Sequence, residues 1–214
     1  MLVIISDLHL TDGSTAKTVS ADAFERFRGR LQELAYFASF RAESGTYKPL
    51  EQIDLLLLGD VLDVIRSTRW GDEEPDDPNY ARPWNDLQDE QERAHLLRKV
   101  EQIGEGILLN NEESFKHLRR LSGDKPISLP PATEYGFPTR GQERLPVATK
   151  IHYMVGNHDW FWHIPGVDFE PMRARITEDL GLATPVGPFP HDPLESGASS
   201  RALRDNRVYA RPGD

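Results

Sequence analysis

The sequence contains no cysteine, so it can form neither disulfide bonds nor thiolate metal sites. It also contains no apolar run near the roughly 20 residues that a membrane-spanning helix needs. The first ten residues, MLVIISDLHL, carry no basic leader and reach a charged residue at Asp7, so we expect no signal peptide. These absences favour a cytoplasmic protein without a membrane span.

The sequence has fewer basic than acidic residues. The chain has 25 Lys and Arg against 35 Asp and Glu, which gives a formal net charge of -10. An acidic surface repels a phosphate backbone, so we do not expect nucleic acid as a partner. Residues 71–92 carry much of the acidity, and we interpret them as a solvated loop and the start of a helix. The 214 residues suit a single domain spanning 1–214.

Apolar runs at 2–5, 53–58 and 151–155 predict strands that are buried on both faces. The closing RVYA, residues 207–210, is also strand-like. Residues 122–146 and 184–200 are rich in Pro, Gly or Ser and predict loops.

Helical spacing of apolar residues predicts helices over 20–40, 86–121 and 169–180. Gly104 and Gly106 are expected to break or weaken the second of these. Apolar runs that alternate with helices indicate an α/β layered fold with a central sheet, in which functional groups gather beyond the carboxyl ends of the strands.

Polar motifs follow each of the three predicted strands. They read DLH, GDVLD and GNHD, and each one alone has a structural reading as a turn or a helix cap. Together they place oxygen and imidazole donors at one edge of the sheet, and these donors suit Mn, Fe, Zn or Mg. The side chains concerned are Asp7, His9, Asp60, Asp63, Asn157, His158 and Asp159.

The order D-x-H, G-D-x-x-D and G-N-H-D closely resembles the calcineurin-like metallophosphoesterases, over residues 1 to about 160. The resemblance implies a β-sandwich flanked by helices and hydrolysis of a phosphate mono- or diester by metal-bound hydroxide. It implies two divalent metal ions, with Mn the first expectation. Asp7 and His9 would bind the first ion, Asp60 would bridge both, and Asn157 would bind the second.

The same resemblance implies roles for three further residues. His158 would face the substrate and stabilise or protonate the leaving oxygen. Asp159 would orient His158, and Asp63 would support a metal ligand or a loop from behind.

The family pattern continues with a strand ending in HG or HGD and then with GHxH, whose histidines complete the metal shells. Here RVYARPGD matches a strand plus HGD with Pro212 in place of the histidine, and no GHxH follows. We therefore expect the N-terminal part of a longer enzyme that lacks its last strands and binds metal weakly, mainly through Asp7, His9 and Asp60. An exposed sheet edge or face would then be covered by a second copy or a partner chain.

Residues 66–146 form an enlarged segment between the second and third motifs, which we interpret as an insertion resembling a cap. The aromatic run Trp160–Trp162 directly follows GNHD. We expect at least one of its rings to anchor the core, and an aromatic wall for the substrate is the alternative.

Two functional readings follow from these residues. The first is a metallophosphoesterase, and the intact motifs favour it. The second is a phosphoesterase fold kept as a non-catalytic binding or regulatory module, and the missing C-terminal histidines favour that reading.

Overall fold

The computed structural model describes residues 1–15, 17–183 and 187–213. Its strands form one mixed sheet in the order β1-β2-β4-β3. The three predicted strands are confirmed: β1 (Leu2–Ile5), β2 (Gln52–Leu58) and β4 (Leu145–Met154) run parallel, with Ile5 opposite Leu57 and Leu58 opposite Met154. The short β3 (Ile127–Leu129) pairs antiparallel with the start of β4.

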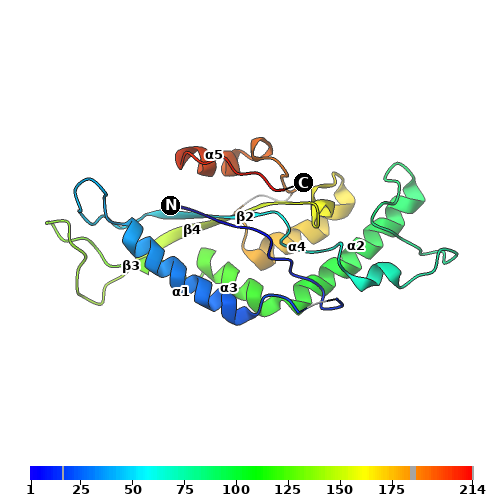
Figure 1. Cartoon of the computed structure of the whole chain (residues 1–214), viewed down its shortest axis with the longest axis horizontal. Coiled ribbons are helices and arrows are strands. Elements are labelled where there is room, and N and C mark those ends of the chain that lie inside the picture. The colour runs from blue at the N-terminus through cyan, green and yellow to red at the C-terminus, as the bar shows by residue number, and fades with distance from the viewer. Residues whose placement is uncertain (16, 184–186, 214) are drawn as a thin grey trace.

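Helices cover the two faces of the sheet unequally (Figure 1). The helices α1 (Ala21–Ala38), α2 (Glu90–Asn110), α3 (Glu112–Ser122) and α4 (Glu170–Leu180) share the main hydrophobic core with one face of the sheet. The other face carries the shorter α5 (Gly197–Asp205), which packs its leucine on a small cluster of buried strand residues. Short 3-10 helices complete the described elements at Thr68–Gly71, Trp160–His163, Val167–Phe169 and Pro193–Glu195.

The general α/β class is therefore confirmed, but the β-sandwich is not. The described residues form a single sheet of four strands, without a second sheet packed against it. Its less covered face instead packs Leu56 and Met154 against Leu203 of α5, with Leu2 and Ile4 at the margin. One amphipathic helix thus buries the apolar side chains that we expected a second sheet to bury.

The predicted break in the second helix is wrong, because α2 runs unbroken through both glycines. A Cβ on Gly104 would lie only 2.9 Å from the Trp162 ring, so glycine leaves room for a tryptophan that is fully buried. The helix ends instead at Asn111, whose side-chain amide donates to the carbonyl oxygens of Ile107 and Thr11 at 2.8 and 2.9 Å. The expectation that the aromatic run anchors the core is confirmed, since Phe161 is fully buried as well.

The predicted strand over 207–210 is also wrong. Arg207 adopts a left-handed backbone (φ 55°), and the amides of Arg207 and Val208 donate to Arg204 and Leu203. This pair of hydrogen bonds is the Schellman motif that ends a helix, so the start of the segment caps α5.

Two predicted loops contain regular structure. Residues 122–146 include β3 and the start of β4, where Val147 and Ile151 face the core while Lys150 faces solvent, a half-buried alternation rather than a fully apolar run. Residues 184–200 include the start of α5, and within that predicted loop 184–186 lie outside the described residues. None of the described helices has the length and apolar character needed to cross a membrane.

Candidate metal centre

The three polar motifs follow β1, β2 and β4 and meet at the carboxyl edge of the sheet, as predicted. Parallel strands deliver their ends to the same side. Backbone hydrogen bonds then join the segments: His9 donates to Asp60 at 2.8 Å, and Val64 donates to the carbonyl oxygen of His158 at 3.2 Å. Asp7 likewise donates to Gly59 at 3.3 Å, so the loops extend the pairing of the sheet past its last strand residues.

The backbone at this edge is strained. Asp7, His9 and Asp60 have φ values of 57°, 45° and 51°, and among the described non-glycine residues only Arg207 joins them in the left-handed region. Each such residue costs on the order of 1 kcal/mol and clusters of them are typical of functional sites. The strain here falls on three of the four residues predicted to bind metal.

Asp7, His9 and Asp60 each bring one ligand atom to a group in which all three atoms lie within 4.8 Å of one another. Asp7 is exposed, and the other two are partly buried. Asn157 adjoins them, and the end of its side-chain amide lies 3.2 Å from both carboxylate oxygens of Asp60. The backbone amide of His158 donates to one of those oxygens at 2.9 Å.

A second group consists of His9, Asp63 and His158. Asp63 is fully buried, and its two oxygens accept from the Nδ1 atoms of His9 and His158 at 2.8 and 2.9 Å. The same carboxylate accepts the backbone amide of Arg66 at 3.1 Å and pairs with its Nε at 3.3 Å. Because a carboxylate only accepts, each imidazole carries its proton on Nδ1 and keeps Nε2 free to bind or exchange a proton.

Asp159 takes a different place from the one that the resemblance implies. It is fully buried and accepts from the backbone amides of Val61 at 2.8 Å and Gly156 at 2.5 Å and from the Tyr153 hydroxyl. It thus joins the loop after β2 to the loop after β4, while Asp63 holds His158. The assignment of Asp159 as the group that orients His158 is corrected accordingly.

Burial raises the pKa of Asp159, although the hydrogen bonds from Tyr153, Val61 and Gly156 act in the opposite direction. Burial and the neighbouring Asp159 raise the pKa of Tyr153 well above its usual value. The phenol therefore stays protonated at neutral pH and donates to the carboxylate.

Glycine is required at position 156, where the loop after β4 contacts the loop after β2. A Cβ on Gly156 would lie 2.4 Å from Asp60 Oδ1 and 2.8 Å from the Asp60 backbone nitrogen, so no side chain fits there. A cavity of about 240 Å³ opens beside this contact, lined by residues that include Asp7, Asp60, Asn157, Arg211 and Pro212. The chain thus places Pro212 at the edge where the resemblance to HGD predicts it, although no strand delivers it.

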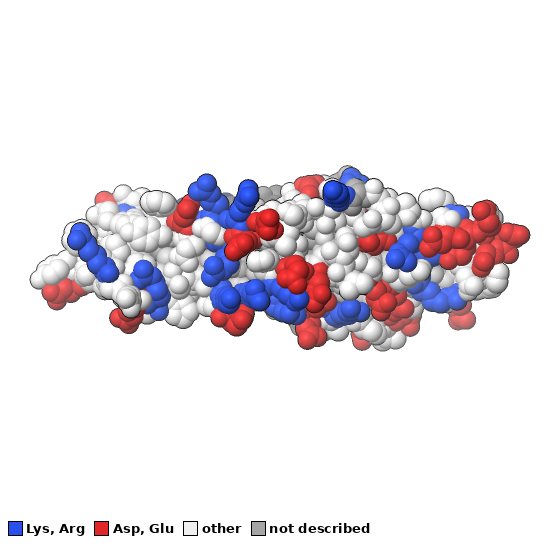
Figure 2. All heavy atoms as spheres, turned by 90° about the horizontal axis from the view of Figure 1, so that it is seen from below, with Lys and Arg blue, Asp and Glu red and all other residues white. Residues whose placement is uncertain are grey.

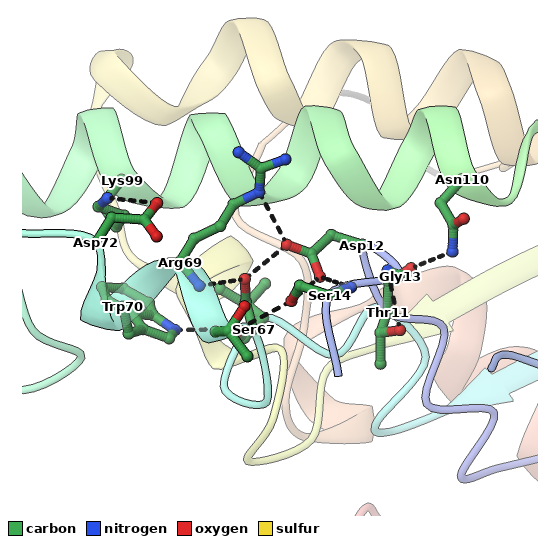
Figure 3. A network of polar contacts seen from close by, with 12 residues as sticks. Thr11, Asp12, Gly13, Ser14, Ser67, Arg69, Trp70, Asp72, Lys99 and Asn110 are labelled. Atoms are coloured by element: carbon green, nitrogen blue, oxygen red, sulfur yellow. Dashed lines mark hydrogen bonds and ion pairs between the residues drawn. The ribbon is translucent and has the colours of Figure 1, made fainter. Parts of the chain in front are cut away.

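A further carboxylate supports the loop after β1 from the α2 side (Figure 3). Asp12, whose side chain is fully buried, accepts from the hydroxyls of Ser67 and Ser14 at 2.6 Å each and from Arg69 Nε at 3.1 Å. Burial would raise the pKa of Asp12, but these hydrogen bonds outweigh it and hold the pKa below its usual value. The network joins the segment after β1 to the segment after β2.

Searches with protein-family models, curated proteins and solved structures found no match to this chain. The functional assignment therefore depends on the geometry and on the motif resemblance.

The motif resemblance implied that Asp159 orients His158, whereas the carboxylate that contacts His158 is that of Asp63. Asp63 lies three residues after Asp60. Its side chain contacts the two imidazoles, while that of Asp60 belongs to the metal group. The sequence did not indicate that Tyr153 bonds Asp159, because a tyrosine inside an apolar strand is as typical of an ordinary core residue as of a buried hydrogen-bond donor.

Proposed function

We propose that this protein is a divalent-metal-dependent phosphoesterase. The observation that carries the proposal is the convergence of Asp7, His9 and Asp60, with ligand atoms within 4.8 Å, beside a second imidazole that shares Asp63 with His9. The calcineurin-like metallophosphoesterase family, with its two-metal site, is the finer form of this proposal.

The donor set fits a hard or borderline cation. Asp7 and Asp60 offer carboxylate oxygens, and His9 offers Nε2 because Asp63 occupies its Nδ1. The Asn157 amide fits in either orientation: its nitrogen can donate to Asp60 across 3.2 Å, and its oxygen in that place would share a cation with the carboxylate. Mn is the first candidate, with Fe, Zn and Mg as alternatives.

Bound divalent ions would neutralise the anionic ester and make hydroxide available near neutral pH. The residues of the chain supply the remaining chemistry. Asp63 holds the rings of His9 and His158 with centroids 5.0 Å apart, so the His158 ring lies against that of a proposed metal ligand. With Nδ1 held by Asp63, a proton carried on His158 Nε2 would pass to the leaving oxygen.

The alternative is a non-catalytic binding module, and one observation favours it. Pro212 lines the cavity that holds Asp7, Asp60 and Asn157, and proline offers no atom to a metal. A centre with fewer ligands would bind cations weakly and recognise phosphate without hydrolysing it.

Hydrolysis of p-nitrophenyl phosphate and bis-p-nitrophenyl phosphate with added Mn, together with calorimetric titration of Mn, separates the two functions. We expect Asp60→Ala to lose both metal binding and hydrolysis, and His158→Ala to keep metal binding and lose hydrolysis. His117→Ala is the control, because His117 lies on α3 and belongs to neither group of potential metal ligands. Metal binding without hydrolysis by the unsubstituted chain supports the binding module, and the absence of both from that chain contradicts the proposal.

A further inference from the structure

A second feature lies at the opposite end of the sheet. An open hollow of about 920 Å³ separates α1 from the segment around β3. Tyr36 and Phe37 line its α1 side, and Phe137, Arg140 and Arg144 line the other side. We call these five residues the aromatic groove. Because β3 pairs with the first residues of β4, ten residues of strand, or about 30 Å, separate the groove from the metal edge.

Large apolar side chains are exposed along this groove. Phe37 and Phe137 have exposed fractions of 69% and 64%, and Leu34 and Tyr135 nearby have 53% and 75%. The ring of Tyr36 contacts that of Phe37 with centroids 5.7 Å apart. A hollow lined by such rings is typical of a binding surface, because aromatic side chains contribute large contact areas at a small entropic cost.

The segment that presents Phe137 is fixed in place. Its carbonyl oxygen accepts from the Thr133 amide at 2.7 Å, and its amide donates to the Thr133 hydroxyl at 3.1 Å. The neighbouring Gly136 carbonyl accepts from the Tyr47 amide at 2.7 Å. These bonds fix the backbone that carries the Phe137 ring, so a ligand does not have to order this segment.

The groove is positively charged in a protein whose net charge is -10. Glu33, which also lines the hollow, pairs with Arg30 at 2.7 Å. Neither Arg140 nor Arg144 forms an ion pair with a carboxylate within the described part of the chain. Figure 2 shows basic and acidic groups scattered over this end of the molecule, while acidic side chains gather at the far end. The charge complement of the groove is therefore an anionic group.

Strand addition at β3 is blocked beside the groove. The Gln32 side chain donates to the Ser128 carbonyl oxygen at 2.7 Å and accepts from the Ser128 amide at 3.2 Å. It occupies the backbone groups that an added strand would need, so a ligand has to bind through side chains.

We propose that the aromatic groove binds an extended segment of a partner protein that carries apolar side chains next to carboxylates. The apolar side chains pack on Phe37 and Phe137, and the carboxylates pair with Arg140 and Arg144 in the bidentate geometry that guanidinium favours. This surface lies away from the metal edge and does not depend on the proposed function.

The probe is a short fluorescein-labelled peptide that alternates Phe, Glu and Pro, compared with the same peptide carrying Lys in place of Glu. Fluorescence anisotropy measures binding to the intact chain at low and moderate salt. We expect the Glu peptide alone to bind, and Arg140→Glu with Arg144→Glu to weaken it about tenfold or more. The paired change Arg201→Glu with Arg204→Glu on α5 carries the same change of charge and is expected to leave binding unchanged.

Phe137→Ser is the apolar test, with Leu194→Ser, at an 89% exposed site outside the groove, as its control. We expect only Phe137→Ser to weaken the Glu peptide, by about fivefold or more. Circular dichroism verifies that each variant is folded. Equal binding of the Glu and Lys peptides, or unchanged binding by the groove variants, overturns the proposal. So does light scattering that shows a dimer broken by Phe137→Ser, or flotation with anionic vesicles that these variants abolish, because the occupant is then a second copy or a membrane.

Discussion

The two ends of β4 present opposite surfaces. Beyond Met154, two carboxylates are buried: Asp63 and Asp159 are each fully buried and accept several hydrogen bonds. Beside Leu145, apolar rings are exposed, and Phe137 keeps 64% of its surface open to solvent. Each end inverts the usual rule that polar groups lie outside and apolar groups inside.

The difference shows that catalysis and recognition depend on different interactions. Buried carboxylates hold imidazoles in one orientation because every alternative leaves a charged group unsatisfied, and this rigidity suits chemistry. Exposed rings contribute little to folding stability and become buried when a partner binds, which suits recognition. Substitutions at the two ends should therefore differ greatly in their effect on unfolding.

Asp159→Asn should give the largest effect on stability among the polar substitutions. The amide nitrogen would face donors from Val61, Gly156 or Tyr153 and leave them unsatisfied. We expect the free energy of unfolding to fall on the order of 3 kcal/mol, measured by urea denaturation. Asp76→Asn, at an exposed site, is the control and should change it by less than about 0.5 kcal/mol. Equal effects from the two changes would refute the assigned role of Asp159.

Asp63→Asn should have a smaller effect on stability and a large one on activity. The asparagine can accept from one imidazole only, so His9 and His158 lose their common orientation. We expect about 1–3 kcal/mol of lost stability and a loss of metal affinity and turnover of about 10–100-fold. Arg66→Ala removes the 3.3 Å contact from a half-exposed side chain, and we expect that change to cost below about 1 kcal/mol. A turnover unchanged in Asp63→Asn would contradict the shared-carboxylate arrangement.

Much of this polar end follows from the sequence. Apolar runs of four to six residues indicate the three parallel strands, and parallel strands bring the residues after them to one edge. The positions of Asp7, His9, Asp60 and Asn157 were therefore predictable. Which buried carboxylate holds which imidazole was not, because Asp63 and Asp159 both lie a few residues from the edge and only side-chain direction separates them.

The helical parts were less predictable for a related reason. A glycine in a helix weakens it on its own, and only a ring such as Trp162 packed against Gly104 compensates. The strand-like residues after α5 are a second example, because Val208 completes a helix cap and does not join a sheet. In both places tertiary contacts override local preference.

Asp12→Asn should alter the response to acid. The hydrogen bonds of Asp12 hold its pKa below the usual value, so its contribution to stability is complete above the unfolded pKa of about 3.9 and is lost as pH falls through the lower folded pKa. We expect the variant to be about 1 kcal/mol less stable at pH 7 and to approach the wild type below about pH 4. Urea denaturation at several pH values measures the gap. A gap that stays constant with pH would contradict the lowered pKa.

The smallest effect on stability should come from Phe137→Ser. Its ring is 64% exposed, and the hydrogen bonds that fix the segment are made by its backbone and by Thr133, which the change leaves in place. We expect a change in unfolding free energy below about 0.5 kcal/mol, measured by urea denaturation. Phe161→Ser, at a fully buried ring beside the metal edge, should cost at least about 3 kcal/mol, because it leaves a cavity and buries a hydroxyl. Similar losses in both variants would mean that the groove aromatics belong to the core and are not held ready for a partner.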